Sequence, residues 1–343
     1  MAKPKVVVTG GAGFIGSHTV VELANAGYEP IIIDNFSNSE KQVIARLTQI
    51  TGRPFTVHEL DCGNRDALTS ALDSDVFGVI HFAAFKSVSA SGRDPLGYYR
   101  NNLGSTTSLL SAMQQKKVDN FVFSSSCTVY GQPDVLPVTE ETPMKAAESV
   151  YGRTKQICED IINDLVRSEK SLRAVTLRYF NPVGAHESAL IGELPLGTPE
   201  NLLPYITQTA VGLRQQLTIF GNDYPTVDGT CVRDYIHVVD LAKAHVRALD
   251  WLRDQKPERG SFNEVFNLGT GRGTSVLEAV QAFERVTAKP LPYTIGPRRH
   301  GDVIQTYADA TKANRVLGWK AERSIDDALR DAYRWQVGLQ QRS

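Results

Sequence analysis

Short apolar runs alternate with amphipathic stretches along the first 180 residues of this chain. The runs occupy residues 6–8, 31–33, 55–58, 79–84, 121–123 and 174–177. Apolar, β-branched runs of this length are typical of strands that lie buried in a parallel sheet. The stretches between them predict helices at about residues 13–26, 40–50, 95–117 and 151–167. The pattern therefore predicts an α/β fold built on a parallel sheet.

Three regularly spaced glycines follow the first apolar run. Gly10, Gly13 and Gly16 lie between the predicted strand and the first helix. A strand, a tight glycine turn and a helix, in that order, aim unpaired backbone N–H groups at a diphosphate. We expect Gly10 to permit the turn, Gly13 to let the backbone approach the phosphates, and Gly16 to let the helix pack closely on the strand. The alternative is a purely structural glycine-rich turn.

An acidic residue ends the second apolar run. Asp34 lies about 20 residues beyond the glycine turn, where a carboxylate binds the ribose hydroxyls of NAD. A carboxylate at this position also repels the 2′-phosphate of NADP. The glycine turn and Asp34 together predict a Rossmann-type domain that binds NAD.

The pattern changes beyond residue 184, where glycine and proline become frequent up to about residue 198. A helix is predicted to open at Asn201, another spans about 239–251, and a strand covers 265–268. Amphipathic helices at 310–317 and 324–335 close the chain. Because helix 239–251 and strand 265–268 are expected to return to the main sheet, the predicted domains are interwoven. Residues 1–180 with about 236–268 form the NAD-binding domain, and residues 181–235 and 269–343 form a smaller substrate-binding domain.

Composition excludes several classes of partner. The formal net charge of −1 over 343 residues gives no electrostatic reason to expect nucleic acid or an anionic membrane. The apolar runs are too short for a signal peptide or a membrane span. The four cysteines are widely scattered, which indicates free thiols in a reducing cytoplasm and no metal site.

A serine run and a tyrosine–lysine pair occur later in the chain. Ser124–Ser126 follow the strand at 121–123, and Tyr151 and Lys155 begin the helix at 151–167. Residues at i and i+4 share one face of a helix, and an ammonium beside a phenol lowers a pKa that is ordinarily about 10. Such a pair can be accidental on a surface helix. Its place after a glycine turn and a serine run favours a catalytic set.

Other charged positions have two interpretations each. Asp61 either caps the helix that follows it or reaches the adenine of the dinucleotide. Lys86 is either a site residue or a solvated loop charge. Arg298 and Arg299 either contact a phosphate in a bidentate manner or form a solvated basic loop.

The motifs G-G-A-G-F-I-G at 10–16, S-S-S at 124–126 and Y-G-R-T-K at 151–155 together resemble the extended short-chain dehydrogenase/reductases. Four motifs in the second half are similar to the UDP-glucose 4-epimerase branch of that family: N-L-L-P-Y at 201–205, F-G-N-D-Y-P-T at 220–226, D-G-T-C-V-R-D-Y-I-H-V at 228–238 and P-R-R-H-G-D at 297–302. This resemblance implies a sheet of about seven strands and a cytoplasmic homodimer that pairs through the helices around 95–117 and 150–167. It also implies a role in galactose metabolism.

The resemblance further implies the ligand contacts. Its NAD contacts map to Gly10, Gly13, Phe14, Ile15, Gly16, Asp34, Asn35, Asp61, Cys62, Phe82, Ala83, Ala84, Lys86, Asn101, Ser124, Tyr151, Lys155 and Tyr179. Its contacts to a UDP-hexose map to Ser126, Tyr151, Asn181, Asn201, Leu202, Arg233, Tyr235, Arg299, Asp302 and Thr306.

The implied reaction is reversible epimerisation of UDP-glucose and UDP-galactose through a 4-keto sugar. NAD takes the hydride from carbon 4, Tyr151 takes the hydroxyl proton, Lys155 lowers the tyrosine pKa, and Ser126 relays the proton. One alternative is a 4,6-dehydratase, although such enzymes carry an Asp-Glu pair where this chain has Cys127 and Thr128. Another is a non-catalytic NAD-binding regulator, a type that typically lacks the tyrosine–lysine pair.

The resemblance also bears on the size of the sugar. In similar epimerases, the position four residues after the aspartate of the R-x-G-D turn lines the space beside carbon 2 of the sugar. That position is Thr306 here, while the aromatic Tyr307 is expected to point to the other face of an extended segment. A small residue leaves room for an acetamido group, so UDP-N-acetylglucosamine and UDP-N-acetylgalactosamine are predicted substrates. The alternative is a bulky group from the loop at 185–200 that fills the same space.

Overall fold

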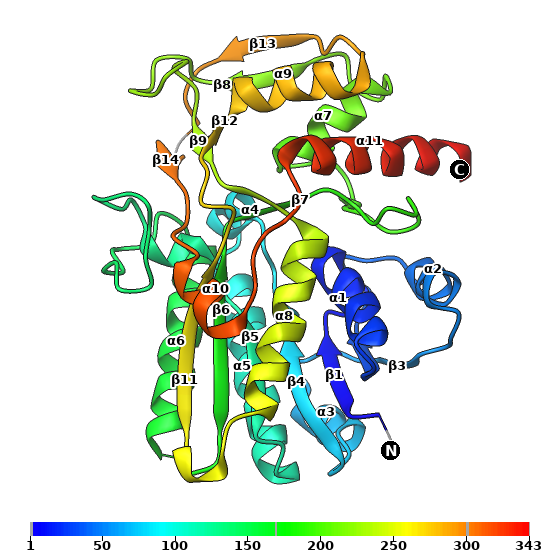
Figure 1. Cartoon of the computed structure of the whole chain (residues 1–343), viewed down its shortest axis with the longest axis vertical. Helices are drawn as coiled ribbons and strands as arrows, with labels where there is room; N and C mark the ends of the chain where they lie inside the picture. Colours follow the sequence, from blue (N-terminus) through cyan, green and yellow to red (C-terminus); the bar gives the residue numbers. More distant parts are fainter. Residues whose placement is uncertain (1–2, 169, 300–301, 343) are drawn as a thin grey trace.

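A seven-stranded parallel sheet lies at the centre of the larger domain in the computed structural model, which describes residues 3–168, 170–299 and 302–342 (Figure 1). The strand order is β11-β6-β5-β4-β1-β2-β3, and all neighbouring strands are parallel. The strands are β1 (Lys5–Thr9), β2 (Glu29–Asp34), β3 (Thr56–Glu59), β4 (Val76–His81), β5 (Asn120–Ser124), β6 (Arg173–Tyr179) and β11 (Phe262–Leu268). The predicted α/β fold with a Rossmann-type parallel sheet is confirmed.

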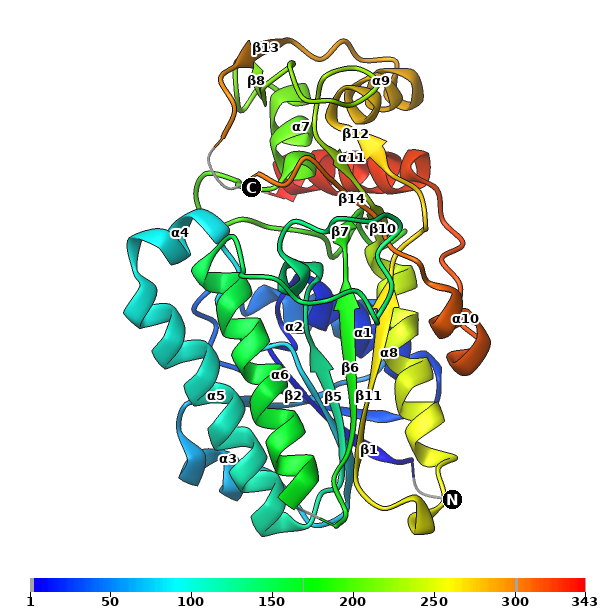
Figure 2. The same cartoon turned by 90° about the vertical axis from the view of Figure 1, so that its left-hand side faces the viewer.

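Helices cover both faces of this sheet because its strands present apolar side chains on both sides. In β1, Val6 and Val8 pack in one core and Val7 packs in the other. The first core is covered by α1 (Phe14–Asn25), α2 (Gln42–Thr51) and α8 (Val238–Arg253). The second is covered by α3 (Arg65–Ala71), α5 (Pro95–Lys116) and α6 (Val150–Ser168), which lie on the opposite side of the sheet from α8 in Figure 2.

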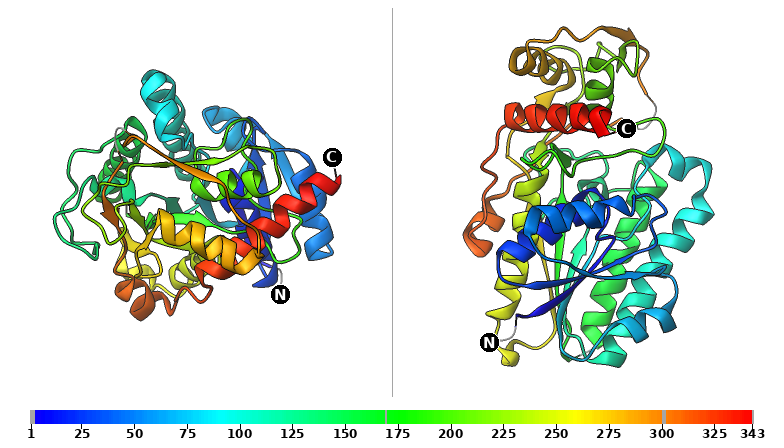
Figure 3. Two further views of the ribbon diagram at one scale, coloured as in Figure 1. Left: turned by 90° about the horizontal axis from the view of Figure 1, so that it is seen from above. Right: turned by 90° about the vertical axis from the view of Figure 1, so that its right-hand side faces the viewer.

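A smaller lobe lies beyond the carboxyl ends of the strands (Figures 1 and 3). Its core gathers side chains that include Leu203, Leu217, Phe283 and Leu329. The lobe contains α7 (Leu202–Ala210), α9 (Val276–Thr287), α11 (Ile325–Arg342), β8 (Leu217–Phe220) and β13 (Tyr293–Gly296). Short strands join the two parts: β7 (Asn181–Val183), β9 (Val232–Arg233), β10 (Tyr235–His237), β12 (Thr274–Ser275) and β14 (Gln305–Thr306).

The chain passes between sheet and lobe more than once. Strand β11 pairs with β6 along its whole length, and α8 packs on the sheet. Helix α10 (Thr311–Leu317) also places Ala313 and Leu317 in the sheet core, although it falls within the 269–343 segment predicted for the smaller domain. The exact domain boundaries stay a prediction.

Three short helices complete the described chain: α4 (Val88–Arg93) and the 3₁₀ turns η1 (Cys127–Tyr130) and η2 (Pro257–Arg259). Among the helices in the described ranges, none combines the length and apolar character needed to cross a bilayer.

Candidate active site

A cavity of about 1380 Å³ lies between the carboxyl ends of the sheet strands and the smaller lobe. Ligands of open α/β sheets bind at this edge. The volume exceeds the roughly 300–1,000 Å³ of a pocket for one drug-sized molecule. The cavity can therefore hold a dinucleotide together with a second ligand. In the described part of the chain, no group of His, Cys, Asp or Glu side chains is arranged to hold a metal ion.

The glycine turn forms one wall of the cavity. Gly10 adopts a φ of +69°, and a Cβ there would lie 2.9 Å from the backbone nitrogen of Ala83. A Cβ on Gly16 would lie 2.1 Å from the carbonyl oxygen of Gly10. Gly16 thus permits packing of α1 on the turn itself, which corrects the prediction that it packs on the strand. The N-cap Gly13 has no side chain to cap α1, so the free N–H groups at this end fit a diphosphate.

Asp34 is held in place at the end of β2. Its Oδ2 accepts a hydrogen bond from the backbone N–H of Ala12 (3.0 Å), and its Oδ1 accepts from Phe36 N (2.9 Å) and Ser39 Oγ (3.0 Å). These bonds fix a carboxylate beside the glycine turn in the cavity wall. A carboxylate in this place is the acceptor that the hydroxyls of a dinucleotide ribose require.

Asp61 belongs to the same wall and does not cap the next helix. Its Oδ2 accepts from Asn35 Nδ2 (2.8 Å) and its Oδ1 from Gly63 N (2.7 Å). The N-cap of α3 is Asn64, whose side chain accepts from the third residue beyond it. Beside Asp61, burial raises the pKa of the Cys62 thiol to about 12, so this thiol behaves as a small neutral group.

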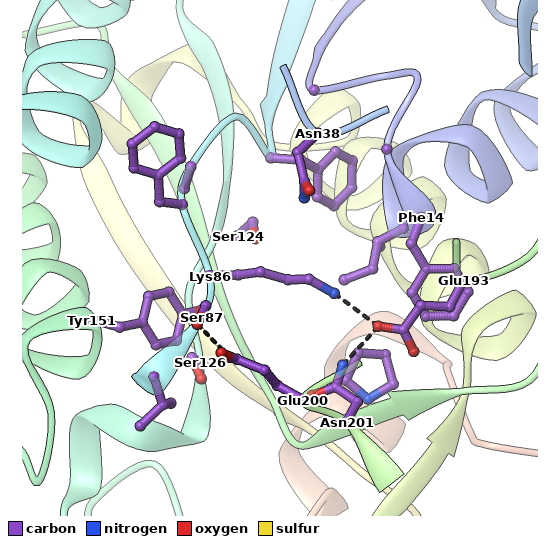
Figure 4. Close-up of a pocket in the computed structure, with 18 of the residues that line it drawn as sticks. Phe14, Asn38, Lys86, Ser87, Ser124, Ser126, Tyr151, Glu193, Glu200 and Asn201 are labelled. Atoms are coloured by element: carbon purple, nitrogen blue, oxygen red, sulfur yellow. Dashed lines mark hydrogen bonds and ion pairs between the residues drawn. The ribbon is translucent and has the colours of Figure 1, made fainter. Parts of the chain in front are cut away.

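The serine run, Tyr151 and Lys155 meet where β5 ends against α6. Figure 4 shows Tyr151 and Ser126 on the same side of the cavity. The Lys155 ammonium donates to the Ser124 carbonyl oxygen (2.6 Å), and the Ser124 hydroxyl is hydrogen-bonded to the Tyr179 hydroxyl. The structure therefore brings the predicted catalytic set together in one wall.

Burial controls the protonation of Tyr151 and Lys155. It raises the pKa of Tyr151 above the ordinary 10, and the hydrogen bond with Ser126 opposes this shift without outweighing it. Burial also lowers the pKa of Lys155 to about 8. Desolvation dominates the pKa of Tyr151, and the Lys155 ammonium contacts the Ser124 carbonyl oxygen. The predicted lowering of the tyrosine pKa by Lys155 stays a prediction.

The sequence did not indicate a buried ion pair that contacts the serine run. Glu159 lies one turn beyond Lys155 on α6, and it accepts a hydrogen bond from the Ser125 hydroxyl. The Arg178 guanidinium pairs with the same carboxylate (Nη2 to Oε2, 2.6 Å), and both side chains are almost fully buried. The i, i+4, i+8 spacing from Tyr151 to Glu159 is the signal that could have found this residue.

Two arginines that line the cavity converge on one carboxylate. Arg299 Nη2 lies 2.7 Å and Arg233 Nη2 lies 3.8 Å from Asp302 Oδ1. Two guanidinium groups against one carboxylate leave an excess of positive charge, which suits a second diphosphate. Arg298 instead turns to Asp223 and does not line the cavity (Nε to Oδ1, 2.8 Å). His300 and Gly301 of the same motif lie outside the described residues.

Thr306 lines the cavity from β14, where it pairs with Arg233 of β9. Tyr307 points the other way, since a Cβ on Gly273 would lie 3.1 Å from its ring. The alternation expected for these two residues is therefore present.

Two predicted substrate contacts do not line the cavity. Tyr235 of β10 is buried in the lobe core, and Leu202 packs against that same core at the start of α7. Their roles stay predictions. The remaining predicted site residues all line the cavity.

Lys86 reaches across the cavity to a residue that the sequence did not indicate (Figure 4). Its ammonium lies 2.9 Å from Glu193 Oε1, and Asn201 Nδ2 donates to the same oxygen (2.7 Å). Lys86 is thus a half-exposed member of an ion pair inside the site. No local pattern predicts this contact, since the partners are separated by 107 positions.

The fold and this cavity define an enzyme of the short-chain dehydrogenase/reductase class, with a dinucleotide cradle on one side and an anion site on the other. The family model described as GDP-mannose 4,6 dehydratase matches residues 7–332. A curated UDP-glucose 4-epimerase of Drosophila melanogaster is 51% identical, and the match covers 98% of this chain and 97% of that one.

Solved structures give the same result. A UDP-glucose 4-epimerase from Stenotrophomonas maltophila with bound NAD and formylated UDP-arabinopyranose is 48% identical, with a TM-score of 0.95 over 99% of this chain and 100% of that one. The epimerase of Bifidobacterium longum, in complex with NAD⁺ and UDP, is 47% identical, with a TM-score of 0.92 over 97% and 98% of the two chains. The chain belongs to the family that the model describes, and within it to the UDP-glucose 4-epimerases.

Proposed function

We propose that this chain interconverts UDP-glucose and UDP-galactose by inversion at carbon 4, with NAD as a resident cofactor. The observation that carries the proposal is that Ser126, Tyr151 and Lys155 line one cavity together with the glycine turn and the Arg233–Arg299 pair. The NAD and UDP ligands of the similar solved epimerases support the same assignment.

The glycine turn and the wall around Asp34 would hold NAD. The turn leaves no space for a Cβ at Gly10 or Gly16, and the N-terminus of α1 is open to an anion. Asp34 would bind the adenosine ribose, and the residues beyond β4 and β5 would face the nicotinamide. When bound, NAD supplies a hydride acceptor and a cationic ring, and that positive charge opposes the desolvation that raises the pKa of Tyr151.

Tyr151 would exchange a proton with the 4-hydroxyl of the sugar. The phenol takes this proton as the C–H bond at carbon 4 breaks, and it returns the proton once the 4-keto sugar has turned over. Ser126 is hydrogen-bonded to Tyr151 and can share the proton. Lys155 orients the serine run through the Ser124 carbonyl, and its charge stabilises the phenolate.

The diphosphate of the sugar nucleotide would lie against Arg233 and Arg299. Asn181 and Asn201 line the same cavity. Charged donors grip the diphosphate firmly, whereas the hexose must be held loosely enough to present both faces of carbon 4. A site that binds the diphosphate tightly and the hexose loosely favours inversion at carbon 4 over a single oxidation.

Thr306 supports a wider substrate range. Threonine is small, and Tyr307 lies outside the cavity wall. We therefore include UDP-N-acetylglucosamine and UDP-N-acetylgalactosamine among the substrates. A bulky side chain at this position would exclude the acetamido group almost completely, whereas losing one favourable contact only weakens binding.

The 4,6-dehydratase alternative is disfavoured by the residues that follow Ser126. Cys127 lines the cavity, but burial raises the pKa of its thiol to about 12. Thr128 has a hydroxyl, which is no acid at neutral pH. Neither residue can supply the acid–base pair that elimination of water requires.

The cellular setting and assembly belong to the same proposal. Four free cysteines, three of them buried, suit a reducing cytoplasm. We propose a homodimer that pairs through the outer faces of α5 and α6 and acts in galactose metabolism.

The reaction is tested by incubating the purified protein with UDP-galactose and no added cofactor. Proton NMR should show UDP-glucose accumulating until both sugars reach a constant ratio, with NAD released on denaturation in about equal amount to protein. Protein that holds NAD but forms no 4-epimer overturns the proposal.

A further inference from the structure

A strap of the smaller lobe, residues 193–201, crosses the cavity to the segment that follows β4. The carboxylates of Glu193 and Glu200 connect the strap to that segment, as Figure 4 shows. Glu193 pairs with Lys86, and Glu200 accepts hydrogen bonds from the hydroxyls of Ser87 and Ser89. Both ends of the strap are thus attached to the larger domain by polar contacts.

Glu193 joins residues assigned to different ligands. Its Oε1 receives both the Lys86 ammonium (2.9 Å) and the Asn201 amide (2.7 Å). By the proposed function, Lys86 serves NAD and Asn201 serves the uridine diphosphate. The Glu193 side chain is 10% exposed, so its interaction with Lys86 is screened less than that of a surface pair.

The backbone of the strap is anchored at this same residue. The Glu193 carbonyl oxygen accepts a hydrogen bond from the Trp335 indole of α11 (3.0 Å). This bond fixes the backbone of Glu193 to the lobe. The ion pair between its side chain and Lys86 therefore forms only when the lobe and the larger domain are in this relative position.

Glu200 provides the second attachment next to the ligand residue. It directly precedes Asn201, the N-cap of α7. Between the two attachments, residues 196–198 are exposed. A segment with few buried apolar contacts opens at low free-energy cost. Glu193 and Glu200 therefore provide the polar attachments on either side of this exposed stretch, next to the buried Pro199.

We propose that Glu193 and Glu200 form a latch that couples binding of the sugar nucleotide to retention of NAD. With the latch closed, Lys86 and Asn201 are held in place together, so each ligand favours the geometry that the other needs. Two ligands that favour one state strengthen each other's binding by the same factor. Glu193 and Glu200 are positioning residues, and neither is assigned a chemical step.

The test measures binding rather than turnover, on the full chain loaded with radiolabelled NAD. The rate of NAD exchange into excess unlabelled NAD is measured with and without saturating UDP, and UDP affinity is measured by calorimetry. In the wild-type protein, saturating UDP should slow NAD exchange by about fivefold or more, which is within the usual range of coupling between sites. In Glu193→Gln and Glu200→Gln the ratio of the NAD exchange rate without UDP to the rate with UDP should fall toward one. The UDP Kd should rise about fivefold or more.

Glu187→Gln is the matched control, because Glu187 is exposed on the same lobe and does not line the cavity. It should match the wild type in both measurements. The latch is overturned if UDP leaves NAD exchange unchanged in the wild type, or if both latch variants keep the wild-type ratio. Failure of the proposed function looks different, because the wild type would then bind no UDP or no NAD at all.

Discussion

Tyr151 is the residue on which the proposed chemistry depends. Burial favours its neutral form and raises its pKa, while Ser126 and Lys155 provide a hydrogen bond and a nearby positive charge. Phenylalanine keeps the ring and its packing but removes the proton-transfer group. We therefore expect Tyr151→Phe to lower kcat by roughly 10²–10⁴-fold, the usual range for a positioned acid–base group.

The measurement is a coupled kinetic assay of UDP-galactose conversion, with UDP affinity determined in parallel. UDP affinity should survive, because the phenol is not a diphosphate contact. Tyr293→Phe is the matched control, since Tyr293 is exposed on β13 and does not line the cavity. Near-normal turnover of Tyr151→Phe would remove this residue from the mechanism.

Single residues were predictable where their chemistry is local in sequence. The φ of +69° at Gly10 follows from the strand–turn–helix pattern, and the i, i+4 spacing places Tyr151 and Lys155 on one face. The direction of the tyrosine pKa was not predictable. It depends on desolvation by residues that are distant in the sequence, and this exceeds the effect of the nearest neighbours.

At the scale of elements, strand β14 decides which side chain faces the sugar. Alternation along the strand turns Thr306 into the cavity and Tyr307 away from it. A tyrosine at position 306 would fill the space that an acetamido group needs. We expect Thr306→Tyr to lower turnover of UDP-N-acetylgalactosamine by roughly 100-fold or more, because steric exclusion is stronger than loss of one contact.

The assay compares both sugars with the same enzyme. UDP-galactose turnover should stay within a few fold of the wild type, and Thr306→Ser should convert both substrates as the wild type does. Wild-type protein that converts UDP-galactose but not UDP-N-acetylgalactosamine would contradict the role given to this position.

Elements formed by contiguous patterns were predictable, and those that need distant partners were not. The apolar runs became β1–β6 and β11, and the predicted helices from 95–117 and 239–251 became α5 and α8 with small shifts. Strands β8 and β13 pair across about 75 positions and have no strong local pattern. Helix α9 was missed although Ser275 and Glu278 form a capping box, which is a readable signal.

At the scale of the whole molecule, three buried histidines bear on stability. Burial lowers the pKa of His18 and of His81 to about 3, and that of His245 to about 4. In the unfolded chain these groups take up protons near pH 6.5. The unfolded state thus binds more protons below pH 6.5, so stability present above that pH is lost as the pH falls toward the folded pKa values.

We expect the free energy of unfolding to fall by up to roughly 4 kcal/mol per pH unit between about pH 6 and pH 4, since each of the three groups contributes about 1.4 kcal/mol per unit. Urea unfolding at a series of pH values measures this slope. A slope near zero across this window would show that the histidines are not held neutral in the folded protein.

Contacts between the two parts of the molecule were beyond sequence reasoning. Residues of both halves line one cavity, and that much was implied by the ligand contacts that the family resemblance maps onto both halves. The pairing of Lys86 with Glu193 did not, because it requires the lobe to be placed over the sheet. Most residues that line the cavity could therefore be predicted, whereas the contact that closes it between the lobe and the sheet could not.

The central claim is that the hydrogen on carbon 4 leaves and returns as hydride within one closed site. The most direct measurement uses UDP-galactose deuterated at carbon 4, incubated with the purified protein in ordinary water until the two sugars equilibrate. Mass spectrometry and NMR should then find UDP-glucose that keeps the deuterium at carbon 4. Loss of the label to solvent would mean that carbon 4 is inverted by deprotonation, and it would contradict the account.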